Sequence, residues 1–291
     1  MPAPLAHVSG LLHGVLLPGA VGMKVVLMAR WDPGRALDLI ERERITYMVG
    51  PPTFFTAMMQ HPSFSSERVD SIRLLSCGGS GVTPSFVRAT AAAFDATVKR
   101  AYGSTEAPTV ATTSSDDDPE KMATTDGRAM AGTELRVDAP AGEAGELWVR
   151  GPELAAGYLD AEETAAAFVD GWFHTGDVAR LDGAWLTIVG RVHDGIIRGG
   201  ENISVAEVEQ VLEAHLAVRH AVAVGEPDER LGERVAAFVV APDGFDLPTC
   251  KAWFAAQGAS RLIVPERIEV LAELPTLPSG KPDRQALRRM L

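Results

Sequence analysis

The sequence predicts an α/β protein followed by a smaller α+β domain. In residues 1–110, helical periodicity around Ala36–Ile40 alternates with the short apolar runs Ile45–Val49 and Ile72–Ser76. The second run ends in the glycine-rich turn Gly78–Gly81. Helix, buried strand and glycine turn in repeating order are typical of α/β layers. We therefore expect a mixed sheet with helices in the front part of the chain.

The rear part has a different pattern. From Gly145 the chain becomes β-rich, with strand candidates Glu146–Arg150 and Trp185–Val189. After residue 194 a compact α+β pattern follows. Its expected elements are a helix after Ser204, strands Ala221–Gly225, Arg234–Val240 and Arg267–Leu271, and a helix around Pro248–Gln257. We place a domain boundary between residues 192 and 193, which gives a large domain over 1–192 and a small one over 193–291.

The glycine pair Gly199–Gly200 and the helix after it form the most informative stretch. Ser204 and Glu207 make the S-x-x-E pattern of a helix start. Apolar residues then recur at near-helical spacing, at Val205, Val208, Val211, Leu212 and Leu216. The glycine pair lets the backbone approach a ligand or adopt a conformation that a Cβ would forbid. We interpret the stretch as a junction between domains, although an ordinary loop and helix has the same pattern.

Composition excludes several classes of protein. The chain has 291 residues, of which 46% are hydrophobic and 23% charged, so it is globular. Its net charge of −12 argues against a general nucleic-acid surface. The two cysteines, Cys77 and Cys250, lie far apart, which excludes a disulfide scaffold and a cysteine zinc site. They fit a reducing cytoplasm.

The N-terminal segment carries no targeting pattern that we recognise. Met1–His7 has no basic region, so it is not a secretory signal. The apolar run Leu11–Leu27 is interrupted by glycines, a proline and Lys24, and it is too short to span a membrane. We expect it to be a buried glycine-rich segment.

The segment Tyr102–Glu106 follows a predicted strand, and three of its side chains are suited to a nucleobase, a phosphate and Mg²⁺. The ring of Tyr102 offers a face for a nucleobase, and Thr105 offers a hydroxyl to a phosphate oxygen. Glu106 offers a hard oxygen ligand for Mg²⁺, which binds through one or two carboxylates plus substrate phosphates. Taken alone, a turn with a surface carboxylate explains these five residues equally well.

Two further short motifs each have a ligand-binding interpretation and a purely structural one. In His174–Asp177, the carboxylate of Asp177 can accept hydrogen bonds from ribose hydroxyls. The alternative is an Asx-type turn that closes a hairpin. In Leu274–Lys281, a proline- and glycine-shaped loop can project the charge of Lys281 into a cleft, where it neutralises a carboxylate and a phosphate. The alternative is a solvated lysine.

Together and in order, these motifs resemble those of the adenylate-forming superfamily, which comprises acyl-CoA synthetases, luciferases and peptide-synthetase adenylation domains. The resemblance covers nearly the whole chain. The segments that carry it are Pro4–Gly10, Gly50–Thr53, Gly78–Gly81, Tyr102–Glu106, Gly145–Tyr158, His174–Asp177, Gly190–Asn202, Leu231–Arg234 and Pro278–Lys281. It implies the C-terminal part of the large domain, with mixed sheets and a small β-rich subdomain, and a small mobile α+β domain.

The resemblance also implies a role for each candidate residue. Nucleotide and CoA binding fall to Gly78, Gly79, Ser80, Tyr102, Gly103, Asp177, Arg191, Gly199, Gly200 and Glu201. Within this set, Asp177 and Arg191 bind the ribose, and the Gly199–Glu201 face lines the pantetheine channel. The catalytic residues are Lys281, Thr105 and Glu106, and Glu106 also holds Mg²⁺. The acyl pocket is flanked by His7, Val8 and Ala107, and the hinge is at His193 and Asp194.

The implied reaction has two halves. A carboxylate attacks the α-phosphate of ATP to give acyl-AMP and pyrophosphate, and a thiol then displaces AMP. Residues 7–10 contain no acid to pair with an amino-acid ammonium group, which favours a carboxylic-acid:CoA ligase. The motifs look most like ligases for fatty or cyclic carboxylic acids. The implied partners are a small carboxylic acid, ATP and CoA, with no nucleic acid and no membrane span.

One expected feature is missing from these 291 residues. Family members carry a Ser/Thr/Gly-rich loop ending in Pro-Lys-Gly, whose backbone N–H groups wrap the terminal phosphates of ATP. No such loop occurs here. The resemblance therefore implies an N-terminally truncated ligase with an impaired ATP step and with exposed surface that favours self-association. The alternative is a non-catalytic fragment or pseudoenzyme that retains nucleotide, acyl-AMP or partner binding.

Overall fold

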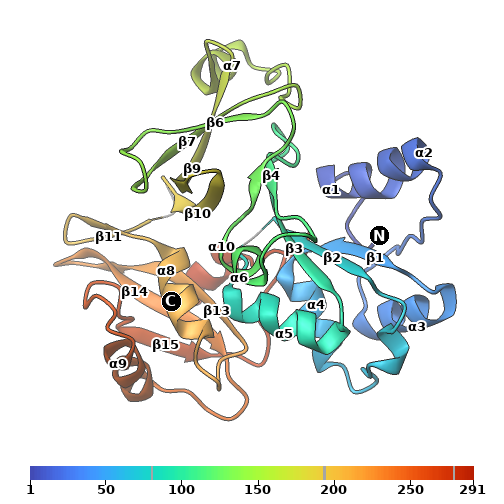
Figure 1. The fold of residues 1–291 in the computed structure, drawn as a ribbon. Helices are drawn as coiled ribbons and strands as arrows, with labels where there is room; N and C mark the ends of the chain where they lie inside the picture. The colour runs from blue at the N-terminus through green and yellow to red at the C-terminus, as the bar shows by residue number, and fades with distance from the viewer. Residues whose placement is uncertain (80, 193–194, 278) are drawn as a thin grey trace. The chain divides into compact units, whose positions relative to one another are not determined.

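The computed structural model describes residues 1–79, 81–192, 195–277 and 279–291. These residues form two compact units (Figure 1). Unit 1 comprises Met1–Thr175, Arg180–Thr187 and Pro278–Lys281, and unit 2 comprises Gly176–Ala179, Ile188–Leu277 and Pro282–Leu291. The predicted domain boundary at residues 192 and 193 stays a prediction, because His193 lies outside the described residues.

The sheet of unit 1 begins with three parallel strands, β1 (Tyr47–Gly50), β2 (Leu74–Gly78) and β3 (Thr97–Tyr102). Two short antiparallel strands, β4 (Ala111–Thr112) and β5 (Arg128–Ala129), extend it beyond β3. The strand order is β1-β2-β3-β4-β5, so β1 forms one edge. The α/β fold class predicted from the sequence is confirmed.

The helices that accompany this sheet are α3 (Pro33–Glu43), α4 (Pro52–Gln60), the 3₁₀ helix η2 (Glu67–Val69), α5 (Pro84–Phe94) and α6 (Pro119–Thr124). Side chains cap the starts of α3, α5 and α6. Asp32 and Thr83 accept hydrogen bonds from the first turns of α3 and α5. Asp118 caps α6 by accepting hydrogen bonds from the backbone N–H groups of Glu120 and Lys121.

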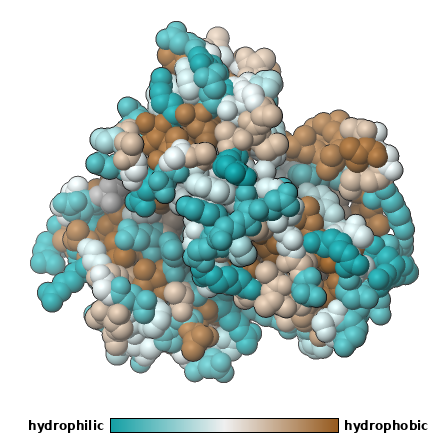
Figure 2. Space-filling view, viewed as in Figure 1, coloured by the Kyte–Doolittle hydropathy of each residue, from teal (hydrophilic) through white to brown (hydrophobic). Residues whose placement is uncertain are grey.

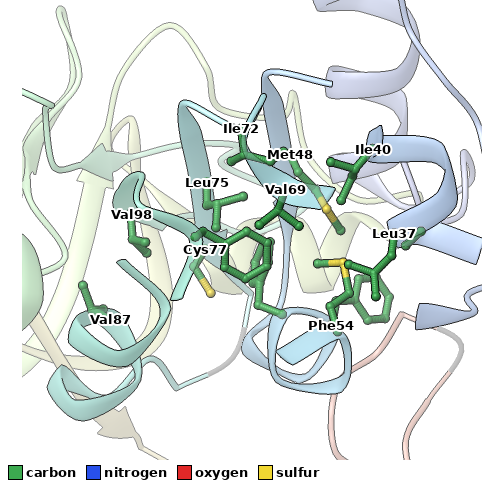
Figure 3. Close-up of a cluster of buried hydrophobic side chains, with 14 of the residues drawn as sticks. Leu37, Ile40, Met48, Phe54, Val69, Ile72, Leu75, Cys77, Val87 and Val98 are labelled. Carbon is green, nitrogen blue, oxygen red and sulfur yellow. The ribbon is translucent and has the colours of Figure 1, made fainter. Parts of the chain in front are cut away.

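The core of this layer is apolar and well filled. Phe55, Met58 and Leu37 from the helices pack with Leu75 and other side chains of the strands (Figure 3). Cys77 lies in the same cluster and is fully buried. This core fixes the ends of β2 and β3, from which two of the candidate loops emerge.

The first helical segment contradicts the expectation of a buried Leu11–Leu27 stretch. It consists of α1 (Val8–Leu11), the π-helix η1 (Leu12–Leu16) and α2 (Leu17–Val21). Five of its large apolar side chains are exposed and form what we call the aliphatic face (brown over α1 and α2 in Figure 2): Leu11, Val15, Leu16, Leu17 and Val21. The inner positions belong to Gly10, Gly14 and Pro18 instead. No helix among the described residues is both long and apolar enough to cross a membrane.

The second sheet is the expected β-rich region. Its strands are β6 (Glu134–Val137), β7 (Ala144–Arg150), β8 (Phe168–Val169), β9 (Trp172–Asp182) and β10 (Trp185–Arg191), in the order β10-β9-β7-β6 with β8 paired to β9. Helix α7 (Ala161–Ala167) precedes β8. His174–Asp177 lies inside β9, so the Asx-type turn that closes a hairpin is excluded. Gly176 has a φ of +68° within the strand.

Unit 2 holds the third sheet, in which β13 (His220–Asp228) and β14 (Gly232–Val240) form a long antiparallel pair. The other strands are β11 (Ile196–Arg198), β12 (Glu201–Ile203) and β15 (Arg267–Val270). The helices are α8 (Val205–Glu213), α9 (Leu247–Ala256) and α10 (Arg284–Arg288). Ser204 caps α8 as predicted, by accepting a hydrogen bond from the backbone N–H of Glu207. Leu216 was expected on the apolar face, but α8 ends before it and its side chain is fully exposed.

Candidate nucleotide and acyl site

Two candidate loops of unit 1 leave neighbouring strands at the same edge of the sheet. Gly78 ends β2 and is paired in register with Ala101, one residue before Tyr102 ends β3. A Cβ at Gly78 would lie 2.2 Å from the carbonyl oxygen of Ala101, so only glycine fits there. Because carboxyl ends of parallel strands form the usual ligand edge of an α/β sheet, this edge is the natural place for a binding site.

The loop after Tyr102 is compact and internally bonded. The backbone N–H of Ser104 donates to the Ala107 carbonyl at 3.0 Å, and the Ala107 N–H donates to the Ser104 hydroxyl at 3.2 Å. A Cβ at Gly103 would lie 2.4 Å from the Thr109 nitrogen, which requires glycine. The turn buries Ala107 and leaves Thr105 exposed. It therefore presents the Thr105 hydroxyl to solvent, as a phosphate contact would need.

Glu106 is held by a segment that lies about fifty residues further along the chain. The hydroxyl of Tyr158 donates a hydrogen bond of 2.8 Å to Glu106 Oε1, and the Ala155 N–H donates to the Glu106 carbonyl at 2.7 Å. Partial burial and the hydrogen bond to the Glu106 carboxylate raise the pKa of Tyr158 to about 12. Tyr158 is thus a neutral donor at physiological pH and orients this carboxylate.

Lys281 lies over the glycine turn of β2. A Cβ at Gly79 would be 3.3 Å from Lys281 Cε and 3.9 Å from Nζ, so the lysine stem occupies the space that a side chain at Gly79 would take. Gly79 has a φ of +80°, which also favours glycine. The charge of Lys281 and the loop after β2 are therefore brought together, although they are far apart in sequence.

The loop that carries Lys281 is anchored to the start of α4. The Thr53 hydroxyl donates a 2.5 Å hydrogen bond to the Gly280 carbonyl. A Cβ at Gly280 would lie 2.4 Å from the ring of Phe54, and Gly280 has a φ of +84°. This packing leaves little freedom for the backbone immediately before Lys281.

His7 and Val8 lie at the start of α1. The Ser9 N–H donates to His7 Nδ1 at 3.2 Å, so the imidazole caps this helix. Partial burial and then the positive charge of Lys281 lower the pKa of His7, which keeps the ring neutral. His7 therefore faces the same lysine as Gly79. Val8 is half-buried.

Asp177 and Arg191 form an ion pair within unit 2. Arg191 Nε donates to Asp177 Oδ1 at 2.8 Å. Asp177 is 5% exposed, whereas the arginine side chain is largely open to solvent. The Val192 N–H donates to the Gly176 carbonyl at 2.9 Å, which fixes the backbone beside Asp177. The carboxylate is thus oriented, as binding of a ribose diol would require.

The glycine pair forms a tight hairpin turn in unit 2. Gly199 and Gly200 join β11 to β12, and their φ values are +61° and +91°. Positive φ at both central residues is the requirement of a type I′ turn. The Gly199 N–H donates to the Leu231 carbonyl at 2.7 Å, and Glu201 is exposed beside the turn. Ser80, His193 and Asp194 lie outside the described residues, so their expected roles stay predictions.

The residues fit Mg²⁺ only as a partner of a bound phosphate. Among the residues that the structure describes, no group of three or more histidine, cysteine or acidic side chains is placed to hold a metal ion. Glu106 lies in the loop after β3, and its carboxylate accepts the hydrogen bond from Tyr158. Mg²⁺ commonly binds through one or two carboxylates and substrate phosphates, so this donor set suits it.

Sequence reasoning missed the two residues that hold the site in place. Thr53 and Tyr158 lie in segments that carried the resemblance, but no role was assigned to either. Thr53 contacts a residue 227 positions away and Tyr158 one 52 positions away. A tyrosine after a glycine and a threonine after two prolines gave no local signal of these partners.

Comparison with protein families finds two matches. Residues 1–159 match the family described as AMP-binding enzyme, and residues 207–281 match the AMP-binding enzyme C-terminal domain. Together they cover most of the chain, in the order expected from the resemblance.

Similar proteins of known activity include several ligases. The chain is 38% identical to the medium-chain fatty-acid–CoA ligase of Escherichia coli, over 99% of this chain and 53% of that protein. It is 38% identical to a feruloyl-CoA synthase of an Amycolatopsis species, over 99% and 60% of the two chains. It is 36% identical to the 2,3-dihydroxybenzoate-AMP ligase of Bacillus subtilis, over 99% and 56%. The chain thus spans slightly more than half the length of these relatives.

Solved structures give the same result. The amide bond synthetase McbA of Marinactinospora thermotolerans superposes with a TM-score of 0.86 at 35% identity, over 99% of this chain and 61% of that one. ATP-bound MatB of Rhodopseudomonas palustris superposes with a TM-score of 0.88 at 28% identity, over 99% and 59%.

Proposed function

The chain belongs to the AMP-binding enzyme family, the adenylate-forming superfamily, and on this premise we propose that it is part of a carboxylic-acid:CoA ligase. The proposed reaction forms an acyl-AMP from a carboxylic acid and ATP, with release of pyrophosphate. A CoA thiolate then attacks the acyl carbon, and the bond to AMP breaks. The supporting relatives are two CoA ligases and an AMP ligase.

The observation that carries the proposal is the position of Lys281 over Gly79. A carboxylate and an α-phosphate repel each other, and a fixed ammonium group between them offsets that repulsion most in the transition state. The loop is anchored by Thr53 and shaped by Gly280, so the charge is positioned before substrate binds. A lysine that only faces solvent would not need a loop held by the Thr53–Gly280 hydrogen bond.

The Tyr102–Glu106 loop supplies the remaining adenylation groups. We assign stacking of adenine to Tyr102, beside the glycines at Gly78, Gly79 and Gly103, and a contact with the α-phosphate to Thr105. Glu106, oriented by Tyr158, would hold Mg²⁺, which neutralises phosphate charge when bound. The acyl group would pass near His7 and Val8, and Ala107 would contribute from within the loop.

Unit 2 supplies the residues proposed for ribose and CoA. Asp177 would accept hydrogen bonds from the ribose diol, with Arg191 holding its carboxylate in place. The type I′ turn at Gly199–Gly200, with Glu201, offers side-chain-free backbone to a pantetheine arm. The assignment of residues 193–291 as a mobile domain that pivots at His193 and Asp194 also stays a proposal.

The proposal extends to the class of acid and to the compartment. The relatives named above act on a medium-chain fatty acid, ferulate and 2,3-dihydroxybenzoate, so a fatty or cyclic carboxylic acid fits the family. Both cysteines are buried and not in disulfides, and burial raises the thiol pKa of Cys250 to about 12. Such inert thiols agree with the proposed cytoplasmic location.

A second candidate is binding without turnover. The observation that favours it is the lack of a Ser/Thr/Gly-rich phosphate loop in these 291 residues. Without that loop, the departing pyrophosphate is poorly neutralised. We therefore propose that these residues alone bind AMP or acyl-AMP but adenylate weakly.

Calorimetric binding of a medium-chain acyl-AMP analogue tests the site. Lys281→Ala should weaken binding about tenfold, because it removes a charge-assisted contact of roughly 1.4 kcal/mol. The matched control is Lys251→Ala, an exposed lysine of α9 outside the candidate site. If the analogue does not bind, or if both variants bind it equally, the site assignment is wrong.

A turnover assay separates the two candidates. The chain is incubated with ATP, Mg²⁺, CoA and a panel of carboxylic acids, and pyrophosphate release is followed. We expect thioester formation from supplied acyl-AMP but little pyrophosphate from ATP. Normal CoA-ester formation from ATP would refute the impaired ATP step.

A further inference from the structure

The glycine turn of unit 2 lies at the end of a short two-stranded ribbon. Strands β11 and β12 pair over three residues each and are joined by Gly199 and Gly200. An isolated two-stranded hairpin is at best marginally stable in water. Among the described residues, one pair in register, Arg198 with Gly232, joins β11 to β14 (Figure 1). The position of the turn therefore depends on the other contacts that hold β11 to β14.

A side chain of β14 extends the ladder of hydrogen bonds beside the turn. The Gly199 N–H donates to the Leu231 carbonyl at 2.7 Å. In an antiparallel ladder, the next N–H on the same side belongs to the residue two positions away, here Ile197. This N–H donates at 2.8 Å to Oε2 of Glu233. The carboxylate of Glu233 is thus the acceptor that holds the backbone of β11 two residues before the turn.

The neighbouring strand β13 leaves space for this carboxylate. A Cβ at Gly225 would lie 2.4 Å from Glu233 Oε1 and 2.6 Å from its Cδ, so any side chain at Gly225 would displace it. The backbone does not itself require glycine there, because the φ of Gly225 lies outside the left-handed region. The absence of a side chain at Gly225 therefore serves the carboxylate of Glu233.

A second glutamate supports the next residue of β11. Arg198 Nε donates to Glu266 Oε1 at 2.8 Å, and Glu266 Oε2 accepts the Val235 N–H of β14 at 2.9 Å. Glu266 thus connects a side chain of β11 to the backbone of β14, whereas Glu233 holds the backbone of β11 directly. Two carboxylates therefore support adjacent residues immediately before the turn.

We infer that Glu233 is a positioning residue for CoA binding: its hydrogen bond to Ile197 fixes β11, and β11 fixes the Gly199–Gly200 turn. The inference rests on the proposed function, which assigns this turn to the pantetheine arm. A surface that is held in place before binding has less freedom to lose when a flexible arm binds. Loss of the Glu233 carboxylate should therefore lower the affinity for CoA and leave the adenylate site unchanged.

Calorimetry with CoA tests this role. CoA is titrated into the chain saturated with a medium-chain acyl-AMP analogue that is inert toward thiols. Glu233→Met removes the acceptor at nearly constant side-chain length and should weaken CoA binding about tenfold. Glu233→Gln keeps an acceptor oxygen and should stay within roughly threefold of the parent. The control Glu229→Met alters an exposed glutamate between β13 and β14 and should leave the affinity unchanged.

Two further measurements separate positioning from a loss of folding. The three variants should bind the acyl-AMP analogue as tightly as the parent, because neither glutamate belongs to the proposed adenylate site. Hydrogen exchange at the amides of Ile197 and Gly199 needs no ligand. It should be about tenfold faster in Glu233→Met than in the parent, and close to the parent in Glu233→Gln.

Several outcomes would overturn the inference. They are CoA binding by Glu233→Met as tight as that of the parent, binding by Glu233→Gln as weak as that of Glu233→Met, an equal loss of acyl-AMP affinity in Glu233→Met, and unchanged exchange at Ile197 and Gly199. A parent chain that binds the analogue but not CoA refutes the positioning role and leaves the adenylate site standing. A parent that binds neither refutes the proposed function, on which the inference rests.

Discussion

The two units differ in how completely their sheets are covered. Along β13 and β14, alternate residues enter two separate clusters. Ala223 and Val235 face α8 and α9, whereas Val224 and Phe238 pack with Leu287 of α10. Both faces of this sheet are therefore sealed by its own unit. Unit 1 also has a fully buried core around Phe55, but its segment α1–α2 leaves large apolar side chains exposed.

A unit can therefore have a fully buried core and still leave large apolar side chains exposed elsewhere. Full burial of a leucine or valine contributes about 1.5–3 kcal/mol relative to exposure. The aliphatic face forgoes much of that contribution, whereas unit 2 leaves few large apolar residues of its central strands exposed.

The largest effect on folding stability is expected from truncating one core phenylalanine in each unit. Phe55→Ala in unit 1 and Phe254→Ala in unit 2 should each lower stability by about 3–5 kcal/mol, because both rings are fully buried. We expect two transitions in urea unfolding, each variant shifting its own. A single transition that both variants shift equally would show that the units are not independent.

Replacing a buried carboxylate of unit 2 should have the next largest effect on folding stability. Glu226 accepts hydrogen bonds from Arg234 and Arg267, each at 2.7 Å, and is 7% exposed. Glu226→Gln should cost roughly 1–3 kcal/mol in urea unfolding. The matched control in unit 1 is Glu134→Gln, whose exposed pair with Arg150 should contribute little.

The same carboxylate gives a pH dependence. The hydrogen bond from Arg234 and then that from Arg267 lower the pKa of Glu226 below its ordinary 4.5 in the folded state. Its contribution is therefore present above pH 4.5 and is lost as the pH falls through the lower folded pKa. Unfolding curves of Glu226→Gln should lack this part of the acid destabilisation. Identical pH profiles for the variant and the parent would exclude the ion-pair network as its source.

The smallest effect is expected on acyl-AMP affinity, from removing the hydrogen bond between Thr53 and Gly280 in unit 1. Thr53→Val removes the hydroxyl that donates to Gly280 and should weaken acyl-AMP binding about threefold to tenfold. Thr53→Ser keeps the hydroxyl and should restore most of the affinity. Full affinity in Thr53→Val would mean that the packing of Gly280 against Phe54 positions Lys281 instead.

Local patterns predicted local structure well. The periodicity at Ala36–Ile40 corresponds to α3, and the runs Ala221–Gly225 and Arg234–Val240 lie in β13 and β14. Such patterns suffice because propensity, capping and burial agree over a few residues. The prediction of Leu11–Leu27 was wrong because hydrophobicity does not say which face of a segment is turned inward. There the small residues take the inner face.

The candidate site shows the same distinction between what local patterns predict and what long-range contacts determine. Motif chemistry identified Glu106, Asp177 and Lys281, and the structure places Lys281 over Gly79. The contacts that orient them join distant segments, as Thr53 does with Gly280, and no local pattern contains them. Likewise, a glycine before Asp177 suggested a turn, but pairing with neighbouring strands keeps Gly176 within β9.

The outward leucines of α1–α2 also determine how a cell would handle this chain. Molecular chaperones and proteases recognise exposed aliphatic segments as signs of unfinished folding. A chain whose aliphatic face is covered would escape this surveillance, and one whose face is bare would be retained or degraded. Its abundance in vivo would then depend on whether this face is covered, independently of how stable its two cores are.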